Sequence, residues 1–483
     1  MSKVIIAWFR QDLRIRDNPV LAEVLRRDAA VLPVYIHAPE EDGAWAPGAA
    51  SRWWLYHALA GLAGDLEALG LPLVIRRGSP EEALTSIVAS MRGAGHPVDS
   101  VACARVYEPD RVQHDEQVRE VLDEVGVGWW QGNASLLIEP EHVCNKSGDP
   151  FRVFTPFWKH LRGLPPEPPV AVDADRLEAP DHVPDSLALD DLELLPTRSW
   201  DDGIAAAWDP SPAGARTVLE DFVEERVTAY KRCRDVPGVN GTSRLSPYLH
   251  SGQVGPRQVW AAVHAAGGAD NDGGFTFLSE VAWREFAYHL LHHFPRTTDE
   301  PMYEKYRDFP WAPDPQALQA WQKGRTGYPF VDAGMRQLWK TGWMHNRVRM
   351  VAASFLVKHL LQPWQDGARW FWDTLVDADL ASNTMGWQWV AGSGADAAPY
   401  FRIFNPFGQG EKFDPDGDYV REFVPELAGL PDKYIHRPWE APDEVLAKAG
   451  VVLGETYPEP IIEHRAGRQR ALDALEATRQ QAG

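Results

Sequence analysis

The apolar stretch "VIIAWF" (residues 4–9) decides the fold, because it is long enough for a buried strand and too short for a buried helix. Three similar runs follow it, at residues 30–38, 71–78 and 99–107. Helical patterns lie before the third of the four runs, at residues 51–70, and after the last, at residues 112–125. Strands and helices that alternate at this spacing predict a doubly wound, Rossmann-like parallel sheet extending to about residue 130. The residues after the first run, "FRQDLRIRDN", contain no G-x-G-x-x-G pattern, which disfavours a dinucleotide-binding Rossmann domain.

A second type of sequence begins after the α/β pattern. Residues 163–199 are rich in proline and acidic side chains, which indicates a long surface connection. Strand patterns disappear after about residue 205, and helical periodicity takes over at residues 216–234, 277–294, 330–340 and 345–361. We therefore predict an α/β domain over 1–130, an interdomain linker over 131–205 and an all-α domain over 206–483.

Composition excludes several classes of protein. No run of about 18 apolar residues predicts a membrane span, and the N-terminus lacks the features of a signal peptide. The only cysteines, Cys103, Cys144 and Cys233, lack metal-ligand spacing, so we expect neither zinc nor disulfides and predict a reducing cytoplasm. The net charge of −21 argues against nucleic acid unless cations gather on one face.

One stretch of the helical region favours such a face. Five Lys or Arg residues and no acid lie between Arg336 and Lys358, which predicts a local basic surface. A solvated helix face is the usual interpretation of a run like this.

Two kinds of candidate site stand out in the helical region. Hydroxyl residues precede a helix start in "NGTSRLSPYLHSG" (240–252), where backbone N–H groups and hydroxyls could bind phosphate, although a helix cap alone would use the same residues. Two helical faces combine an indole with polar or thioether groups suited to a planar, polar-edged ligand such as a base; they are Glu280, Trp283 and Arg284, and Trp343, Asn346, Arg347 and Met350. Taken singly, each of these is more often half-buried packing.

The stretch 377–389 carries the most concentrated chemistry. Asp377 and Asp379 suggest acid–base catalysis or a metal site, but the sequence contains no third ligand motif. An ion pair with Arg347 or Arg349 is therefore the better expectation. The chain has 21 Trp residues, and core filling explains most of them. It does not explain an isolated "GWQW" (386–389).

These residues carry a dense family resemblance. The motifs are "WFRQDLRIRDNPVL" (8–21), "VFTPFWK" (153–159), "GTSRLSPYL" (241–249), "DADLASN" (377–383), "GWQWVAGSGADAAPYFRIFNP" (386–406) and "YPEPII" (457–462). The sequence resembles the photolyase/cryptochrome family from about residue 4 to 465, and most of all its bacterial class I cyclobutane pyrimidine dimer photolyases. The resemblance implies an N-terminal antenna domain, a helical domain that binds FAD, and a light-dependent enzyme, a deoxyribodipyrimidine photo-lyase. Photoexcited reduced FAD would give an electron to a flipped-out dimer in UV-damaged DNA and recover it after splitting.

The resemblance also implies roles for individual residues. FAD contacts are expected from Tyr230, Thr242, Ser243, Leu245, Ser246, Arg349, Asp377, Asp379 and Asn383, the last beside flavin N5. The dimer pocket is expected from Glu280, Trp283, Asn346, Met350 and Trp389, and DNA contacts from Arg234, Arg284, Arg347 and Arg402. Trp387, Trp364 and Trp311 match the chain of tryptophans that carries electrons to the flavin. No side-chain nucleophile is required, because the cofactor supplies the difficult chemistry.

The second, light-harvesting chromophore stays open among folate, deazaflavin and flavin. Folate-binding members carry an Asn–Glu pair where Asp110–Arg111 stands here, and a Lys where "RTTDE" (296–300) stands. Deazaflavin-binding members have an acidic residue at the position of Val106 and a Lys near that of His250. Neither pattern is present.

Two rival functions remain. A cryptochrome, a blue-light receptor without repair activity, would share the fold and FAD, but such receptors usually extend into a long disordered tail, whereas about twenty helical residues follow "YPEPII" here. Pattern alone would give a nucleotide-binding α/β protein with a helical partner domain. We expect a monomer that binds DNA, and we expect neither a bound metal nor association with a membrane.

Overall fold

The computed structural model describes residues 3–397 and 401–481 and begins with a five-stranded parallel sheet. Its strands are β1 (Val4–Phe9), β2 (Ala30–His37), β3 (Val74–Arg77), β4 (Val98–Ala104) and β5 (Gly128–Gly132), in the order β3-β2-β1-β4-β5. The four predicted strands are confirmed. The fifth, β5, was not predicted, because "GWWQG" lies at the sheet edge, is only partly buried and therefore lacks the apolar run of a central strand.

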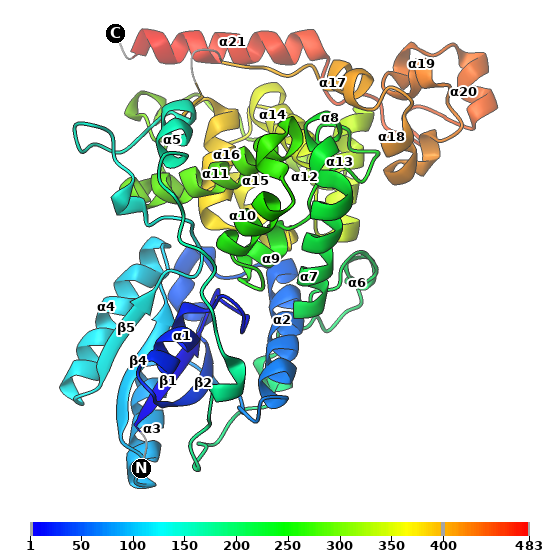
Figure 1. The fold of residues 1–483 in the computed structure, drawn as a ribbon. Coiled ribbons are helices and arrows are strands. Elements are labelled where there is room, and N and C mark those ends of the chain that lie inside the picture. The colour runs from blue at the N-terminus through cyan, green and yellow to red at the C-terminus, as the bar shows by residue number, and fades with distance from the viewer. Residues whose placement is uncertain (1–2, 398–400, 482–483) are drawn as a thin grey trace.

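Helices cover both faces of this sheet (Figure 1). Alternate residues of β1 point to opposite sides: Ile5 and Ala7 share a core with α1 (Pro19–Arg26) and α2 (Ala49–Glu67), whereas Val4 and Ile6 share one with α3 (Pro80–Gly93) and α4 (Pro109–Glu124). This arrangement confirms the predicted doubly wound fold.

The segment between sheet and helical region closes against the sheet. It contains a helix that the pattern did not predict, α5 (Phe154–Leu161). Further along, the N–H of Leu187 donates to Ile75 O at 3.1 Å and the N–H of Val31 donates to Glu178 O at 2.8 Å. The contact with Ile75 covers β3, the edge strand, which would otherwise leave unpaired backbone groups.

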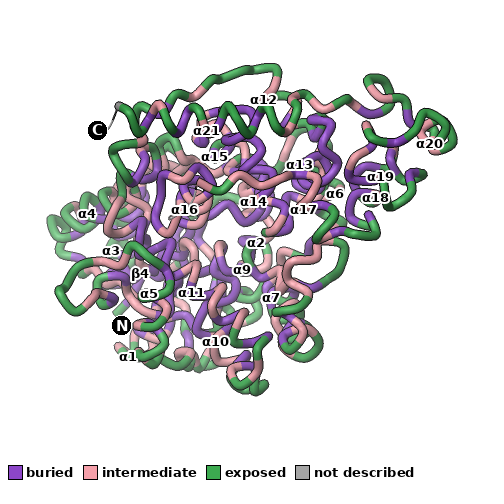
Figure 2. Tube along the Cα trace, turned by 90° about the horizontal axis from the view of Figure 1, so that it is seen from above, coloured by how far each residue is buried: buried purple, intermediate pink, exposed green. Residues whose placement is uncertain are grey.

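The remainder is helical, and no strand occurs in the described residues after 205. Its helices are α6 (Asp202–Ala207), α7 (Pro212–Asp221), α8 (Tyr230–Cys233), α9 (Ser246–His250), α10 (Pro256–Ala265), α11 (Asp272–His293), α12 (Pro315–Gln322), α13 (Pro329–Thr341), α14 (Asn346–Ser354), α15 (Trp364–Thr374), α16 (Leu380–Ala391), α17 (Pro406–Phe413), α18 (Asp418–Phe423), α19 (Asp432–Ile435), α20 (Asp443–Ala449) and α21 (His464–Gln481). Two π-helical segments, η5 (Phe222–Arg226) and η10 (Phe355–His359), interrupt the patterns predicted at 216–234 and 345–361. Figure 2 shows α14 and α16 near the buried centre and α20 at the exposed periphery.

Tryptophans of α2 join the two regions. Trp54 Nε1 donates to Gln253 Oε1 at 2.9 Å, and its ring packs edge-on against Tyr248 and Trp208 of the helical region. Trp53 Nε1 donates to Asp201 Oδ2 at 3.0 Å. Several of the many tryptophans are therefore core residues, as expected. The described helices include none that is long and apolar enough to cross a membrane.

Candidate functional site

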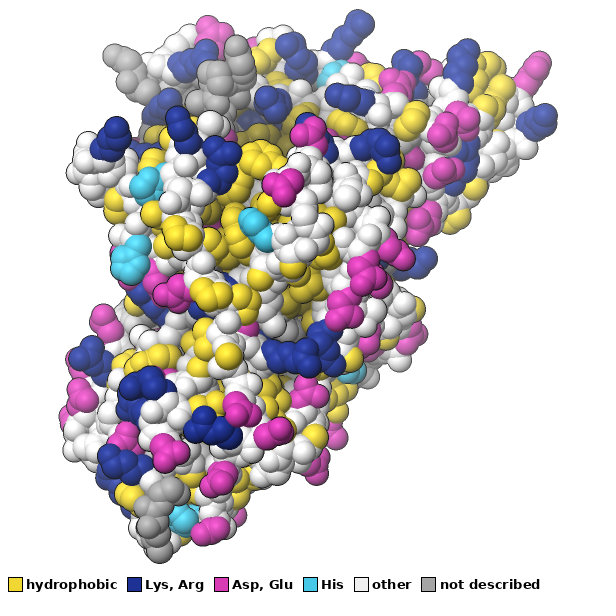
Figure 3. Space-filling model, viewed as in Figure 1, with side chains coloured by type: hydrophobic (Ala, Val, Ile, Leu, Met, Phe, Trp, Pro, Cys, Tyr) yellow, Lys and Arg dark blue, Asp and Glu magenta, His cyan; other side chains and the backbone are white. Residues whose placement is uncertain are grey.

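A cavity of about 580 Å³ opens among the helices of the C-terminal region, lined by residues of α8, α9, α11, α14, α15 and α16. Figure 3 shows hydrophobic side chains filling a hollow in the helical half of the molecule, with Lys and Arg side chains around its upper part. Most of the predicted site residues line the cavity: Tyr230, Arg234, Thr242, Ser243, Ser246, Glu280, Trp283, Arg284, Asn346, Arg347, Arg349, Met350, Asp377, Asp379, Asn383, Trp387 and Trp389. Leu245, Trp311, Trp364 and Arg402 are not among its lining residues.

One end of the cavity has the features of an anion site. Thr242, Ser243 and Ser246 line it beside Arg244, whose backbone takes a positive φ of 56°. The Arg244 guanidinium lies 4.1 Å from the centroid of the Trp208 ring and 5.3 Å from that of Trp343. Leu245, in contrast, is buried in the core just before α9, so its side chain does not reach the cavity.

Arg244 has no counter-ion. It donates to the carbonyl of Ala207 at 3.4 Å, and no carboxylate lies within 4 Å of its guanidinium in the part of the chain that the structure describes. Burial lowers the pKa of Arg244 for this reason. A partly buried cation beside three hydroxyls fits a ligand that brings phosphate, because the phosphate would compensate the charge. Sequence reasoning missed Arg244, although it stands in the middle of "GTSRLS".

The cavity wall also holds a partly buried ion pair. Arg349 Nη2 donates to both carboxylate oxygens of Asp377, at 2.8 and 3.0 Å, and Arg349 Nε donates to Met344 O at 2.6 Å. The predicted pairing of Asp377 with an arginine is confirmed for Arg349. Arg347 pairs with Asp235 instead, at 2.9 Å.

Asp379 caps α16 and is held ionised. Its Oδ1 accepts the N–H of Ser382 at 2.7 Å, and its Oδ2 accepts the Tyr288 hydroxyl and lies 3.7 Å from His250 Nδ1. Burial alone would raise the pKa of the Asp379 carboxyl. His250, Arg284 and Tyr288 outweigh burial and hold that pKa below its ordinary value, which leaves a stable anion at the cavity wall.

The cavity wall also contains a neutral amide. Asn383, one turn after Asp379, donates its Nδ2 to Ala368 O at 3.0 Å, so the amide is anchored to α15. It can meet a ligand edge without gaining or losing a proton, unlike a carboxyl group at the same place.

An aromatic platform occupies the side of the cavity near α5. Trp283 lies flat on Phe154, with ring centroids 3.7 Å apart and an interplanar angle of 9°. Glu280, one turn earlier on α11, is hydrogen-bonded to Arg234. Burial raises the pKa of Glu280, and Arg234 opposes that rise. Asn346 and Met350 of α14 and Trp389 of α16 line the same cavity.

The prediction of a shared helical face is right for α11 and wrong in part for α14. Trp343 was expected on one face with Asn346, Arg347 and Met350, but α14 begins at Asn346, with His345 as its N-cap. Trp343 reaches the cavity from the loop before the helix. The cause is local, because the His345 side chain accepts the N–H of Arg347 and starts the helix there.

The predicted basic surface between Arg336 and Lys358 is wrong. Arg336 pairs with Glu426 at 2.7 Å, Arg347 and Arg349 have the partners named above, and Lys358 is only 1% exposed. The compensating acids come from other parts of the chain, which a local charge count does not see. Arg402 is exposed, and its guanidinium lies 5.9 Å from the Trp389 ring centroid.

Of the three tryptophans of the expected chain, Trp387 and Trp364 are equally buried and Trp311 is partly exposed. Trp387 lines the cavity, Trp364 at the start of α15 is 2% exposed, and Trp311 is half-buried at the edge of the same apolar cluster. Trp387 and Trp389 belong to one turn of α16. Between them Gln388 accepts the N–H of Met302 at 2.8 Å and donates to the carbonyls of Thr297 and Glu300 at 2.6 and 2.8 Å.

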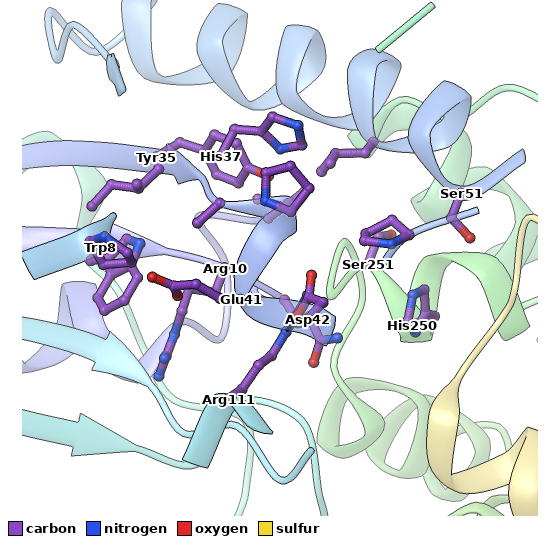
Figure 4. A pocket seen from close by; sticks show the side chains of 18 of the residues that line it. Trp8, Arg10, Tyr35, His37, Glu41, Asp42, Ser51, Arg111, His250 and Ser251 are labelled. Atoms are coloured by element: carbon purple, nitrogen blue, oxygen red, sulfur yellow. Dashed lines mark hydrogen bonds and ion pairs between the residues drawn. The ribbon is translucent and has the colours of Figure 1, made fainter. Parts of the chain in front are cut away.

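A smaller cavity of about 140 Å³ lies between the sheet and the helical region (Figure 4). Arg111 donates to both oxygens of Asp42 in its wall, at 2.5 and 3.1 Å, and burial together with the nearby Glu81 raises the pKa of Glu41 to about 7. His250 lines this cavity and faces Asp379, which lines the larger one. This residue pair therefore connects the walls of the two cavities.

Comparisons with known proteins agree on one family. The model for "DNA photolyase" matches residues 5–173 and the model for "FAD binding domain of DNA photolyase" matches residues 277–477. The deoxyribodipyrimidine photo-lyase of Agrobacterium fabrum is 47% identical over 98% of each chain, and cryptochrome-2 of Arabidopsis thaliana is 38% identical over 99% of this chain and 80% of its own. A crystal structure of a bacterial class III photolyase from Agrobacterium tumefaciens is 45% identical, with a TM-score of 0.94 over 99% of this chain and 98% of that one. That relative is a class III photolyase, so the similarity does not support the expected closeness to class I.

Proposed function

The chain belongs to the DNA photolyase/cryptochrome family, and from this premise we propose that it is a deoxyribodipyrimidine photo-lyase that repairs UV-damaged DNA. The observation that carries the proposal is the 580 Å³ cavity, which combines an uncompensated Arg244, the Arg349–Asp377 pair and the Trp283 platform. The division into residues 1–130, 131–205 and 206–483 belongs to the same proposal.

The residues present fit FAD. Thr242, Ser243 and Ser246 would hold the pyrophosphate by hydrogen bonds, and Arg244 would supply its counter-charge. Arg349 and Asp377 would meet the polar edge of the ring, with Asn383 beside it. When bound, FAD would absorb light and supply the electron that opens the cyclobutane ring. The protein would hold the flavin ring system in a fixed position and exclude water around it.

The rest of the cavity would hold the damaged bases. A pyrimidine dimer stacks poorly in DNA, so it costs less to flip out than a normal pair, and this difference contributes selectivity. The free face of Trp283 would stack on one base while Phe154 supports the other face of the indole. Glu280 and Asn346 would meet polar edges of the dimer, and Met350 and Trp389 its apolar faces. Arg234, Arg284, Arg347 and Arg402 would meet the DNA backbone or lie beside the lesion.

A separate route would return the flavin to its reduced form. Trp387, Trp364 and Trp311 would carry the electron from the edge of the apolar cluster to the cavity, because all three belong to that cluster and Trp387 lines the cavity. Indole is the most easily oxidised of the apolar side chains, so a hole can move from one ring to the next. Trp311, the most exposed of the three, would be refilled from a reductant in solution.

The experiment that tests repair uses the purified full chain. The protein, reduced with dithionite, is mixed with a duplex that contains one cyclobutane thymine dimer, and is illuminated with blue light. Loss of the dimer in the light and not in the dark is the expected result. A yellow protein that leaves the dimer intact would contradict repair while keeping the flavin site.

A blue-light receptor is the second candidate, favoured by the 38% identity to cryptochrome-2. It would share the FAD site and the tryptophan route but would have no need of a lesion pocket. Affinity for dimer-containing over undamaged duplex separates the two functions, because only a repair enzyme requires that preference.

We also propose a site for the second chromophore. The smaller cavity, with Arg111–Asp42 in its wall, is where we place a folate, deazaflavin or flavin.

A further inference from the structure

Lys358 is a buried lysine without an acidic partner. It belongs to the π-helical segment η10, is 1% exposed, and has no carboxylate within 4 Å among the described residues. A buried ammonium is costly unless other groups replace its water, so its surroundings show what it does.

Two groups replace that water, and they come from Ala391 and Phe401. Lys358 Nζ donates to the carbonyl of Ala391 at 2.6 Å, at the last residue of α16. The same Nζ lies 3.0 Å from the centroid of the Phe401 ring. The C-terminal end of a helix favours a cation, and the face of an aromatic ring does so as well. Lys358 therefore connects the end of α16 to Phe401, beyond the loop that begins at Gly392.

The space for this contact depends on a glycine. Gly392 takes a positive φ of 85° after α16, and a Cβ there would meet the Phe401 ring at 3.1 Å and Lys358 Nζ at 3.5 Å. The missing side chain lets the ring and the amine approach the helix end. A further hydrogen bond, from the N–H of Phe404 to Ser354 Oγ at 3.4 Å, ties the residues after the loop to the residue before η10.

The loop ends at the rim of the large cavity. Asp396 lines the cavity and accepts the N–H of Phe154, the residue beneath Trp283, at 3.3 Å. Arg402 directly follows Phe401, is exposed, and lies over Trp389. Its guanidinium has no carboxylate within 4 Å among the residues described, so it is available to a phosphate.

From this geometry we infer that Lys358 is a positioning residue for DNA binding, which acts through Phe401 to set where Arg402 stands at the rim of the cavity. The inference rests on the proposed function, in which Arg402 contacts the DNA backbone. It does not involve the flavin or the dimer, because Lys358 lines neither end of the cavity.

A role in packing alone makes a different prediction. Methionine has nearly the shape of lysine without the charge or the N–H donors, so Lys358→Met fills the same space. If Lys358 only fills space, the variant should bind DNA as the parent does. If it positions Arg402, the loop after α16 should loosen and Arg402 should lose much of its effect on DNA binding.

The test is a double-mutant cycle on the flavin-loaded full chain. Lys358→Met should raise the Kd for dimer-containing and undamaged duplex about tenfold, the change that 1.4 kcal/mol corresponds to. Arg402→Ala should cost about the same in the parent and less than about twofold in the Lys358→Met background, because the first change has already displaced the arginine. Flavin content and the repair rate at saturating DNA should not change. The matched control is Lys433→Met, which removes an exposed lysine lying 4.8 Å from the Tyr434 ring on α19.

Hydrogen exchange without DNA gives an independent readout. Amides of residues 392–405 should exchange faster in Lys358→Met and at the parental rate in Lys433→Met. Unchanged exchange, or a full effect of Arg402→Ala in the Lys358→Met background, would overturn the inference. If Arg402→Ala does not weaken DNA binding in the parent, the proposed role of Arg402 as a DNA contact is wrong. Faster exchange in Lys358→Met would then show that Lys358 still holds the loop, so that only the assignment of Arg402 is contradicted. Should Lys358→Met fail to fold, Phe401→Leu removes the ring at the other end of the contact and must give the same non-additivity and faster exchange.

Discussion

Trp283 and Phe154 form a face-to-face aromatic pair at 3.7 Å, although 129 positions separate them in the chain (283 − 154). One face of the indole is covered by Phe154, so only the other face can accept a ligand. The pair joins α5 of the linker to α11 of the helical region. A stacking surface built in this way is rigid before any ligand arrives, and this lowers the entropic cost of binding.

We predict that Trp283→Ala weakens binding of a dimer-containing duplex by one to two decades. Base–aromatic stacking is worth about 1–3 kcal/mol, and each 1.4 kcal/mol is tenfold in Kd. Phe154→Leu should cause a smaller loss in the same direction, because it removes only the support. Fluorescence anisotropy with damaged and undamaged duplexes measures both. Equal affinity of Trp283→Ala and the parent for the damaged duplex would remove Trp283 from the lesion pocket.

We predict that Trp311→Phe slows light-driven reduction of bound flavin by at least about tenfold, because phenylalanine is much harder to oxidise. Trp158→Phe is the matched control, since Trp158 lies on α5 and outside the tryptophan route. The flavin absorbance under blue light with a thiol reductant reports the rate. Repair by enzyme that was first reduced with dithionite should be the same in both variants. A Trp311→Phe enzyme that cannot repair after chemical reduction would place Trp311 elsewhere in the mechanism.

We predict opposite effects on the apo protein from two changes at the FAD site. Asp377→Ala leaves Arg349 without its partner and should lower the free energy of unfolding by about 3–5 kcal/mol. Arg244→Met removes a cation that already lacks a partner and should leave the apo protein as stable or more stable. Both changes should reduce flavin occupancy. Thermal unfolding with and without FAD measures the two effects, and an apo Arg244→Met protein that is clearly destabilised would contradict the account of Arg244.

We predict that binding of undamaged duplex weakens steeply with salt despite the net charge of −21. The dependence should come mainly from the exposed Arg402, since the Lys and Arg residues from Arg336 to Lys358 are paired or buried except for Lys340. Arg402→Ala should lower affinity for damaged and undamaged duplexes alike and reduce the salt slope by about one. A loss confined to damaged duplex would instead make Arg402 a lesion contact.

We predict that stability falls as the pH rises from about 5 to 8, in part because of Glu285. Burial raises the pKa of this carboxyl to about 7, and its Oε2 accepts the N–H groups of Leu137 and Ile138. The folded protein therefore holds a proton that the unfolded chain has already lost, and deprotonation costs stability on the order of 3 kcal/mol. Glu285→Gln should flatten the pH dependence in urea unfolding. A parallel curve for the two proteins would show that Glu285 does not titrate in this range.

The sequence predicted what depends on local periodicity. The four apolar strands and the alternation of helices with them fixed the α/β sheet, because a buried parallel strand must be apolar on both faces. The strand β5 was not predicted, because an edge strand does not need a continuous apolar run. Trp343 was placed on the wrong side of a helix start, since the His345 cap that ends the loop was not recognised.

Charge was harder to predict than shape. Arg336, Arg347 and Arg349 lie close together in sequence, but their partners Glu426, Asp235 and Asp377 come from three other segments. A run of like charges therefore gave no information on the surface that it forms. Arg244 was the opposite case, a single cation whose importance appears only when no carboxylate reaches it. Of the predicted site, the cavity residues were found from family motifs, whereas Phe154 beneath Trp283 required the fold.

Gln388 has a consequence for how this enzyme can change. Its three hydrogen bonds fix one turn of α16, so the indole of Trp387, which we assign to the redox route, and the indole of Trp389, which we assign to the lesion pocket, cannot shift independently. Backbone adjustments that retune one task would disturb the other. An engineered or naturally drifting variant with a new lesion preference should therefore keep Gln388 and the residues it binds, and alter side chains on α11 or α14 instead.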